Sequence, residues 1–542
     1  MSSRFGPAAR AALTLLLAWL VLYPILIAVG EAAHGDAIRA FASRPGEWRA
    51  LWASVWISFA SVALAAALGV PLAFLFEWLD FPGRKALGSL IALPAVLPPF
   101  VGVIAFLFLY GESGFVARAV QALLGLRSAP WRLQGAGAIL LVHAYSMYVY
   151  FYLFTRAGLA RLDASLVEAA QALGAGRWGT LRRVTLPLLR QSLAGAALLV
   201  FLAALGSFSA PYVFGGGFRV MTTQIVATKL NGELRLAMVE TATLAIVALA
   251  GLAVLRRTEG EDLVTALGKG TGPRRRPIHR ASLRALATAA GWLFAALLLL
   301  PHLTLLLVSL VPYGSWTTET LPPILSVVNY GRLFAEPERL RPLVNSLWMA
   351  AASTCAAVGL ALAAGELAGR RRAGRWRGPI AALVALPWAV PGTVFAVALA
   401  TTFSVHQPLA LRWVLVGSVV LLPFAYLVRS LPVTGRAVLA GYWQLDPALE
   451  EAAASLGAGP WATFRRVTLP LLKPALAAGG SLAFVASLGD FVTSIVLYTY
   501  DNRPISIEIM SSLRVSEMGV AAAFGVVLMV VSAIVLGLGA RR

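Results

Sequence analysis

Residues 168–191 read EAAQALGAGRWGTLRRVTLPLLRQ, and residues 451–474 read EAAASLGAGPWATFRRVTLPLLKP. The two stretches are identical at 17 of 24 positions, at an offset of 283 residues. The same offset also matches Phe201, Ala203, Leu205, Gly206 and Phe208 with Phe484, Ala486, Leu488, Gly489 and Phe491. An internal repeat of this length predicts a chain built from two related halves.

One long polar stretch, residues 256–284, separates the two copies. We therefore expect a first half over residues 1–255, which contains the repeated loop 163–190. A linker over 256–284 follows, and then a second half over 285–542, which contains the repeated loop 446–473. A weaker match between the halves pairs Ala92-Leu93-Pro94 and Pro98 with Ala385-Leu386-Pro387 and Pro391.

Long apolar segments surround both copies. The chain has 542 residues, of which 59% are hydrophobic and 13% are charged, and charged residues make up ~25% of a typical soluble domain. This composition excludes a soluble enzyme and a disordered chain. A helix needs ~20 apolar residues to cross a bilayer, and its backbone must satisfy its own hydrogen bonds there. Twelve segments qualify: Ala11–Gly30, Leu51–Phe76, Leu87–Tyr110, Gly135–Phe154, Ser192–Phe214, Ala237–Leu255, Leu286–Val311, Ser346–Gly365, Ile380–Thr402, Trp413–Val428, Ala475–Tyr498 and Val520–Gly539.

The formal net charge of +21 indicates the orientation of these spans. If the N-terminus lies inside, 30 of the 45 Lys and Arg residues fall in inner segments, Arg429 among them, as the positive-inside rule requires. We therefore predict an all-α membrane protein of twelve transmembrane helices, with both termini inside and two parallel six-helix repeats. A cleaved signal peptide is the alternative interpretation of the first apolar run.

Each repeated loop is expected to form a helix, a turn and a second helix. In the first copy Asp163 caps the first helix, Gly174 ends it in a left-handed conformation, and Pro187 marks the bend into the next span. The second copy has Asp446, Gly457 and Pro470 at these places. A single copy would be read as a solvated loop, but two copies this similar favour a docking role shared by both halves.

The doubled loop resembles the signature loop of permease subunits in binding-protein-dependent ABC importers. That signature is Glu-Ala-Ala, three residues, Gly, nine residues and Ile-x-Leu-Pro, and both copies here have Val in place of Ile. In that family the loop forms a coupling helix that sits in a cleft of the ATP-binding subunit. The resemblance implies these docking residues: Glu168, Ala169, Ala170, Gly174, Leu186, Pro187, Glu451, Ala452, Ala453, Gly457, Leu469 and Pro470.

The resemblance also implies partners, location and substrate. We expect two copies of a cytoplasmic ABC ATPase that binds ATP and Mg²⁺, an extracytoplasmic solute-binding protein, membrane lipid around the chain, and a multi-pass subunit of the bacterial plasma (inner) membrane. Fused double permeases resemble the ferric-iron uptake group, so ferric iron is the expected substrate, with thiamine or a polyamine as alternatives. The alternative class is an ion-coupled secondary transporter. Nucleic acid is not expected as a partner.

No catalytic apparatus is evident in the sequence. A Gly-x-x-x-x-Gly-Lys-Ser/Thr phosphate loop is absent, the five histidines lack metal-ligand spacing, and a single cysteine excludes an internal disulfide. We therefore expect a non-catalytic subunit without a cofactor or metal of its own. ATP hydrolysis would come from a partner.

Polar residues inside spans are costly and often functional. Ser207, Asp490, His143 and Glu240 are the candidates to line a translocation pathway, with helix–helix hydrogen bonding as the alternative for each. Ser207 and Asp490 follow Leu-Gly in equivalent places, so we expect them at the same depth. We expect His302 and Glu366 to be structural. In the outer loops Trp316, Tyr330, Arg339 and Arg341 could contact a binding protein.

Overall fold

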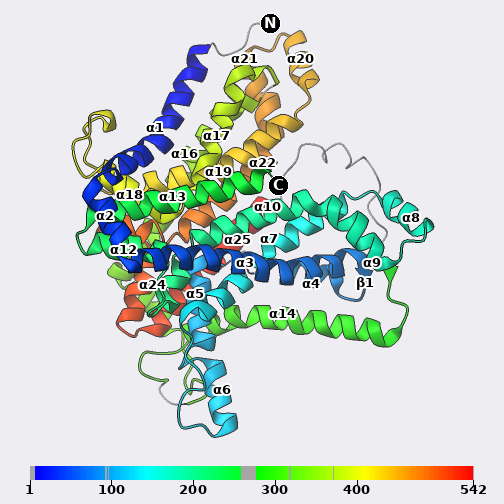
Figure 1. Ribbon diagram of the computed structural model, residues 1–542, viewed down its shortest axis with the longest axis vertical. Coiled ribbons are helices and arrows are strands. Elements are labelled where there is room, and N and C mark those ends of the chain that lie inside the picture. The colour runs from blue at the N-terminus through cyan, green and yellow to red at the C-terminus, as the bar shows by residue number, and fades with distance from the viewer. Residues whose placement is uncertain are drawn as a thin grey trace.

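A computed structural model describes residues 7–91, 94, 97–257, 276–316, 319–369 and 371–540 of the protein. It is almost entirely helical (Figure 1). The helices of the first half are α1 (Pro7–Ala32), α2 (Gly35–Ser43), α3 (Pro45–Trp78), α4 (Arg84–Leu90), α5 (Pro99–Tyr110), α6 (Phe115–Leu124), α7 (Gly135–Ala160), α8 (Ala164–Ala172), α9 (Arg177–Thr180), α10 (Leu186–Leu205), α11 (Ser209–Phe214), α12 (Met221–Leu230) and α13 (Leu234–Arg257).

The helices of the second half follow a similar order. They are α14 (Ala281–Ser309), α15 (Val328–Ala335), α16 (Pro337–Ala364), α17 (Arg377–Ala389), α18 (Gly392–Thr402), α19 (Leu421–Gln444), α20 (Pro447–Ser455), α21 (Pro460–Thr463), α22 (Leu469–Leu488), α23 (Ser494–Leu497), α24 (Ile505–Arg514) and α25 (Met518–Ala540). Short helical turns lie at Leu181–Thr185, Gly365–Gly369, Arg371–Trp376, Pro408–Ala410 and Phe464–Thr468. The linker expected at 256–284 falls largely outside the described residues.

Ten helices in the described part of the chain are long and apolar enough to cross a membrane, and the pair α17 and α18, bent by 105°, is a further candidate. This agrees with an all-α membrane protein. The span expected at Trp413–Val428 is wrong in its bounds, because residues 411–420 are not helical and α19 runs from Leu421 to Gln444. Arg429 and Arg436 lie in α19 and lower its hydropathy, so the apolar window moved toward the preceding loop.

Four of the expected spans are broken rather than continuous. Leu87–Tyr110 divides into α4 and α5, and Ile380–Thr402 divides into α17 and α18. Pro98 and Pro391 stand immediately before α5 and α18. Proline removes a backbone donor and disfavours a helical residue before it, so both breaks have the same cause. The spans expected at 192–214 and 475–498 also break, after α10 and after α22.

Hydrogen bonds repeat between the halves together with the helices. The Ser54 hydroxyl of α3 accepts the backbone N–H of Met221 at 2.7 Å. In the second half the Ser346 hydroxyl of α16 accepts the N–H of Ile505 at 2.8 Å. Each bond fixes the start of a short helix, α12 or α24, against the long helix of its own half. The internal repeat of the sequence is therefore also a repeat of tertiary structure.

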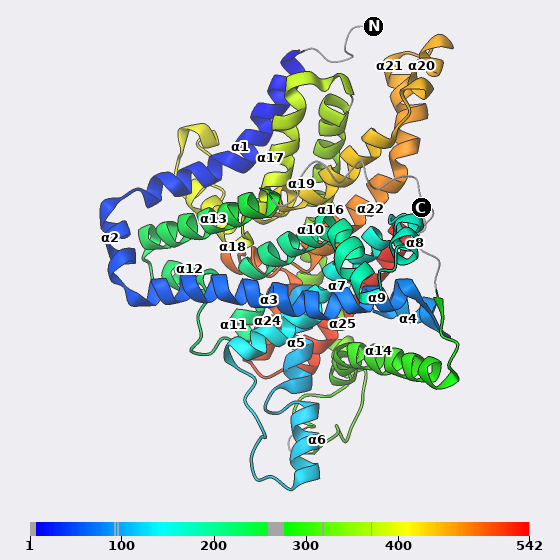
Figure 2. The same ribbon diagram turned by 45° about the vertical axis from the view of Figure 1, so that its right-hand side comes forward.

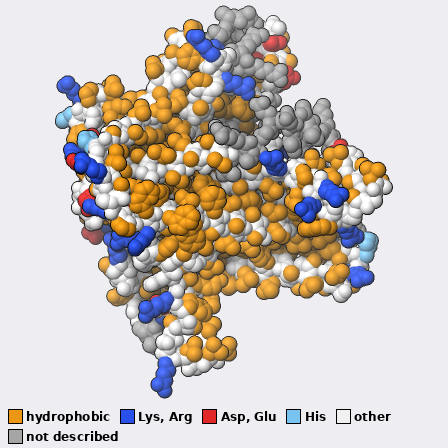
Figure 3. All heavy atoms as spheres, viewed as in Figure 1, with side chains coloured by type: hydrophobic (Ala, Val, Ile, Leu, Met, Phe, Trp, Pro, Cys, Tyr) orange, Lys and Arg blue, Asp and Glu red, His pale blue; other side chains and the backbone are white. Residues whose placement is uncertain are grey.

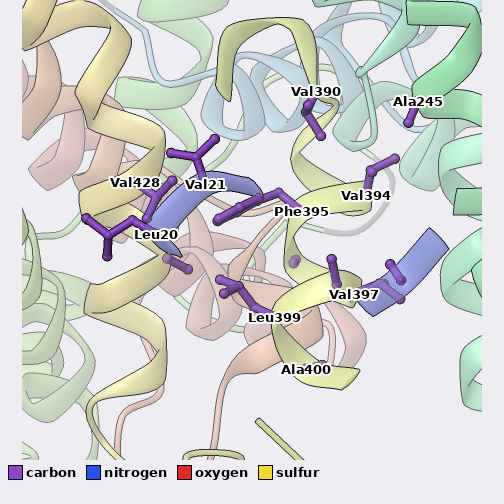
Figure 4. Close-up of a cluster of buried hydrophobic side chains, with 14 of the residues drawn as sticks. Leu20, Val21, Ala245, Val390, Val394, Phe395, Val397, Leu399, Ala400 and Val428 are labelled. Atoms are coloured by element: carbon purple, nitrogen blue, oxygen red, sulfur yellow. The ribbon is translucent and has the colours of Figure 1, made fainter. Parts of the chain in front are cut away.

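The first helix of each half packs against both halves. α1 packs against α17 and α18 of the second half and against α13 of its own, and α14 packs against α4 and α5 of the first half and against α25 of its own. Figure 4 shows one such contact, where Leu20 and Val21 of α1 lie beside Phe395 of α18. A two-residue parallel pair, β1 (Leu79–Asp80) with β2 (Arg276–Pro277), adds a further link ahead of α14.

The outside of the molecule suits a lipid environment. Figure 3 shows hydrophobic side chains covering most of one face, with Lys and Arg side chains mainly toward its edges. Burial of such a surface in hydrocarbon is what long apolar helices require.

Candidate functional site

The two repeated loops have the same backbone. Asp163 accepts the N–H of Ser165 at 3.0 Å and so caps α8, and Asp446 accepts the N–H of Ala448 at 3.0 Å and caps α20. Gly174 then takes a φ of +81° and Gly457 a φ of +82°. A short helix and one π-helical turn lead directly into α10 or α22. The predicted helix, turn and helix are confirmed in both copies.

The loops also expose the same apolar side chains. Leu173 is 88% exposed and its counterpart Leu456 is 89% exposed. Trp178 is 71% exposed and its counterpart Trp461 is 70% exposed. Exposed apolar residues grouped on one surface mark interaction sites. The sequence analysis did not predict these four side chains as docking residues. Their identity in both copies of the repeat was the signal that could have identified them.

The residues expected to dock lie on the same two surfaces. Glu168, Ala169, Gly174 and Pro187 are exposed, and Ala170 and Leu186 are half-buried. The second copy repeats this pattern at Glu451, Ala452, Gly457, Ala453 and Leu469, and differs in that Pro470 is half-buried. In Figure 1, α8 and α20 project from the body at separate corners, and Figure 2 shows the same two helices well apart after a 45° turn.

At the centre of the molecule the helix breaks of the two halves meet. Gly489, at the end of α22, lies against Pro98 of the first half so closely that a Cβ atom would overlap the proline ring. Gly206, at the end of α10, faces Pro391 of the second half, and a Cβ atom there would lie 3.6 Å from the proline Cα. Each break in one half is thus packed on the proline break of the other.

Asp490 is the next residue after Gly489, and its carboxylate forms an ion pair with Arg429. Its carboxylate lies 2.5 Å from Nη1 of Arg429, and its side chain is 8% exposed. The same carboxylate accepts the backbone N–H groups of Thr493 at 2.8 Å and Ser494 at 3.2 Å. Arg429 was expected in an inner segment; it lies instead within α19 and is the partner of Asp490.

Ser207 occupies the equivalent place in the first half with different chemistry. Its hydroxyl lies 2.9 Å from Nε2 of His143, whose Nδ1 lies 2.8 Å from the hydroxyl of Ser61. The backbone carbonyl groups of Ser207 and Asp490 make equivalent contacts in the two halves. Thr222 donates to the carbonyl of Ser207 at 2.7 Å, and Ser506 donates to the carbonyl of Asp490 at 2.7 Å.

Aromatic rings fill the space beside these polar groups. Phe100 of α5 stacks on Phe491 with ring centroids 3.9 Å apart and an interplanar angle of 11°. Phe208 and Tyr212 of the first half contact the same ring at 5.8 Å. This cluster was not predicted, although Phe208 and Phe491 are themselves a repeated pair.

Glu240 does not join this centre. It is buried and accepts a hydrogen bond from Thr228 at 2.8 Å, and Glu47 lies beside it. The amide of Gln224 donates to Glu47 at 3.0 Å. The described contacts of Ser207 and Asp490 do not include Glu240. The structure therefore joins Ser207 to His143 and brings Asp490 to the same region through the contact of Phe208 with Phe491, whereas Glu240 has separate partners.

His302 and Glu366 have local partners, as expected for structural residues. His302 lies 3.2 Å from the carbonyl of Leu298, and Glu366 accepts from the Tyr442 hydroxyl at 2.9 Å. Among the described residues no group of three or more His, Cys, Asp or Glu side chains could hold a metal ion.

The four outer-loop candidates are largely engaged within the chain. Trp316 stacks on Phe115 of the first half at 4.7 Å, and the Tyr330 and Ser309 hydroxyls lie 2.7 Å apart. Arg339 pairs with Glu517 at 2.9 Å and is 15% exposed. Arg341 pairs with Asp501 at 2.7 Å and keeps 49% of its side chain exposed, so it is the most accessible charged group of the set.

Comparison with known proteins matches both halves. A family model described as the binding-protein-dependent transport system inner membrane component matches residues 65–257 and 357–541, and each match contains one repeated loop. The chain is 32% identical over 508 residues to the probable ABC transporter permease protein y4fN of Sinorhizobium fredii, covering 93% of this chain and 89% of that protein.

Two relatives carry named substrates. The ferric transport system permease protein FbpB of Actinobacillus pleuropneumoniae is 29% identical over 451 residues, which is 81% of this chain and 63% of that protein. The thiamine transport system permease protein ThiP of Escherichia coli is 29% identical over 458 residues, which is 82% of this chain and 79% of that protein.

Proposed function

Because the chain belongs to the family of inner membrane components of binding-protein-dependent transport systems, we propose that it imports ferric iron under the control of two ABC ATPase subunits. The chain is a multi-pass inner membrane permease of an ABC importer, with both halves of the permease in one polypeptide. The substrate, the ATPase partners and the roles of individual residues are the proposed parts.

The observation that carries the coupling proposal is the doubled loop. Two identical ATPase subunits need the same surface twice. The two repeated loops offer it, with matching exposed Leu side chains just after α8 and α20 and matching exposed Trp side chains in α9 and α21. Burying a Leu side chain contributes ~1.5–3 kcal/mol. Leu173 and Leu456 are therefore proposed to enter the ATPase clefts, beside the Glu-Ala-Ala segments.

A continuous helical path would carry the motion inward. The first loop runs through the π-helical turn into α10, which ends at the Gly206 break, and the second runs into α22, which ends at the Gly489 break. Each break rests on a proline of the opposite half. When the ATPases close, the loops would move toward each other and the two central contacts would shift together. This is alternating access built on the repeat.

Ferric iron is favoured by the FbpB relatives, and a second candidate has its own support. ThiP is a relative of similar identity, and the rings of Phe100, Phe491 and Phe208 could stack on an aromatic, positively charged solute such as thiamine. Asp490 suits iron, because a hard cation prefers carboxylate oxygen. In that case Arg429 would have to release the carboxylate.

Reconstitution tests both the class and the substrate. The chain is placed in liposomes with its ATPase and a candidate binding protein, and ATP hydrolysis is measured with ferric iron, with thiamine and with a polyamine. Stimulation by iron-loaded binding protein alone supports the proposal. Stimulation by thiamine alone replaces the substrate, and ion-gradient-driven uptake without an ATPase would contradict the ABC mechanism.

A further inference from the structure

A basic pocket lies in the first half, on the side of the molecule where the first repeated loop is found. Its volume is about 180 Å³, and its lining residues are Phe76, Arg84, Lys85, Gly88 and Arg156. A water molecule takes ~30 Å³ in the liquid, so the pocket has room for several waters or for a single phosphate group. The lining comes from the end of α3, from α4 and from the last turns of α7.

The two guanidinium groups are held in place. Arg84 donates to the carbonyl of Phe76 at 2.6 Å, and its side chain is 11% exposed. Arg156 donates to Glu77 at 2.7 Å and to the Tyr152 hydroxyl at 3.2 Å. A guanidinium carries five N–H donors, which is more than these partners accept. The pocket therefore presents oriented donors whose side chains are already ordered.

Gly88 provides the space between them. A Cβ atom at this position would lie 3.5 Å from the Tyr152 hydroxyl and 4.0 Å from Nη1 of Arg156. A larger side chain would extend into the volume that the cations face. The pocket keeps its shape because Gly88 of α4 has no side chain to fill it.

The second half lacks the Glu77–Arg156 ion pair, although the fold repeats. The positions equivalent to Glu77 and Arg156 are Gly369 and Leu439, at offsets of 292 and 283 residues. They still face each other, since a Cβ atom on Gly369 would lie 3.6 Å from Leu439 Cδ2, and Tyr442 packs still closer. The fold therefore requires no ion pair at this place, and among the described residues the Glu77–Arg156 pair has no counterpart in the second half.

We propose that this pocket binds a phosphate group. Three cations line it, and the carboxylates nearby are Glu77, paired with Arg156, and Asp80, which lies 3.8 Å from Arg84 and is largely exposed. Arginine and lysine donors in such a group recognise phosphate through charge-assisted hydrogen bonds. An anionic phospholipid headgroup and free inorganic phosphate share this chemistry. Basic pockets between helices on the cytoplasmic side bind lipid headgroups of this kind.

The location gives the site a structural consequence. Leu159, Leu162 and Leu189 form the base of the first repeated loop, and they pack against Phe74 and Trp78 of α3. A phosphate held by α4 and α7 would tie these helices together directly beside that base. The assignment of the pocket to the cytoplasmic leaflet rests on the proposed function, whereas phosphate binding itself does not.

The test uses the full chain, delipidated in detergent, and native mass spectrometry. Phosphatidylglycerol and cardiolipin are titrated in one arm, zwitterionic phosphatidylethanolamine in the second, and inorganic phosphate, alone and as a competitor, in the third. The variants are Gly88→Val, which fills the pocket without changing charge, and Glu77→Ala with Arg156→Leu, which removes the ion pair that the second half lacks. Arg377→Gln, at the start of α17, is the control that removes a basic side chain outside the pocket.

We expect anionic lipid to bind equally well to the wild type and to the control. Its affinity for both pocket variants should be about tenfold lower, as expected from the loss of at least one charge-assisted hydrogen bond. Binding of inorganic phosphate with the same dependence on the variants supports the site with a free anion as its source. Equal binding of all ligands to wild type and both pocket variants would overturn the proposal. Because no transport is measured, this outcome is distinct from failure of the importer assignment.

Discussion

The two repeated loops present nearly the same surface, whereas the two helix breaks at the centre present different chemistry. Leu173 and Leu456 are exposed to within one percentage point of each other, at 88% and 89%. At the centre, by contrast, Ser207 with a histidine partner stands where the second half has Asp490 with an arginine partner. The halves have kept one region alike and have let the other diverge.

The difference agrees with the partners that we propose for each region. Two copies of one ATPase require two equal docking surfaces, so a change in one loop alone would unbalance the pair. A solute that passes between the halves meets both breaks at once and requires only that their combined chemistry be suitable. The predictions below test whether the loops are truly equivalent and whether the centre is truly not.

The largest effect is expected when both docking surfaces are changed. Leu173→Glu together with Leu456→Glu removes two buried Leu side chains from the proposed interfaces, about 3–6 kcal/mol in all. Coupled transport and ATPase co-purification should be lost, while thermal stability of the isolated chain stays unchanged because both residues are exposed. Each single variant should lose about half of the interaction energy, and the two losses should be equal. Strongly unequal single variants would show that the loops are not equivalent.

The next largest effect concerns the central ion pair. Arg429→Ala leaves the carboxylate of Asp490 buried without its cation, which should cost about 3–5 kcal/mol of stability. His143→Ala, in the equivalent region of the first half, removes hydrogen bonds to two hydroxyl groups but no ion pair, and the loss of those bonds should cost about 1–3 kcal/mol. Thermal unfolding in detergent measures both.

Arg429→Ala with Asp490→Ala is the control for that pair. Removing both charges should restore much of the lost stability, because no uncompensated charge remains. If the double variant is as unstable as the single one, the loss comes from the packing of Arg429 rather than from its charge. Equal losses for Arg429→Ala and His143→Ala would contradict the asymmetry of the centre.

Sequence patterns anticipated the periphery of the permease better than its interior. The loops were predictable because caps, left-handed glycines and helix propensity are local properties, and both copies agree on them. Arg429 was assigned to an inner segment because hydropathy averages over a window and cannot show that Asp490, 61 residues away, neutralises it. The breaks before α5 and α18 left a signal in Pro98 and Pro391, but continuous apolar sequence on either side concealed it.

A smaller effect is expected at the two central glycines. Gly489→Ala places a Cβ atom into the ring of Pro98, and overpacking of this kind costs about 1–3 kcal/mol. Gly206→Ala meets Pro391 at an ordinary contact distance of 3.6 Å and the Leu202 carbonyl at 3.3 Å, which needs only a small shift, so it should cost less than Gly489→Ala. Thermal unfolding and transport are measured for both variants. Tolerance of Gly489→Ala would show that the two halves do not hold each other at this break.

The smallest effect is expected at the turn glycines of the loops. Gly174→Ala and Gly457→Ala force a non-glycine residue into the left-handed region at φ of +81° and +82°, which costs about 1–2 kcal/mol each. No atom lies within 4 Å of the added Cβ in either case, so the cost is conformational rather than steric. Gly176→Ala is the control, because Gly176 has a φ of −62° and equal space around it. Hydrogen exchange of α8 should increase in Gly174→Ala, and that of α20 should increase by the same amount in Gly457→Ala. Neither should change in the control. An increase in only one loop would show that the two loops differ in stability although their backbones match. The loops could then no longer be treated as equivalent when they are compared with the centre.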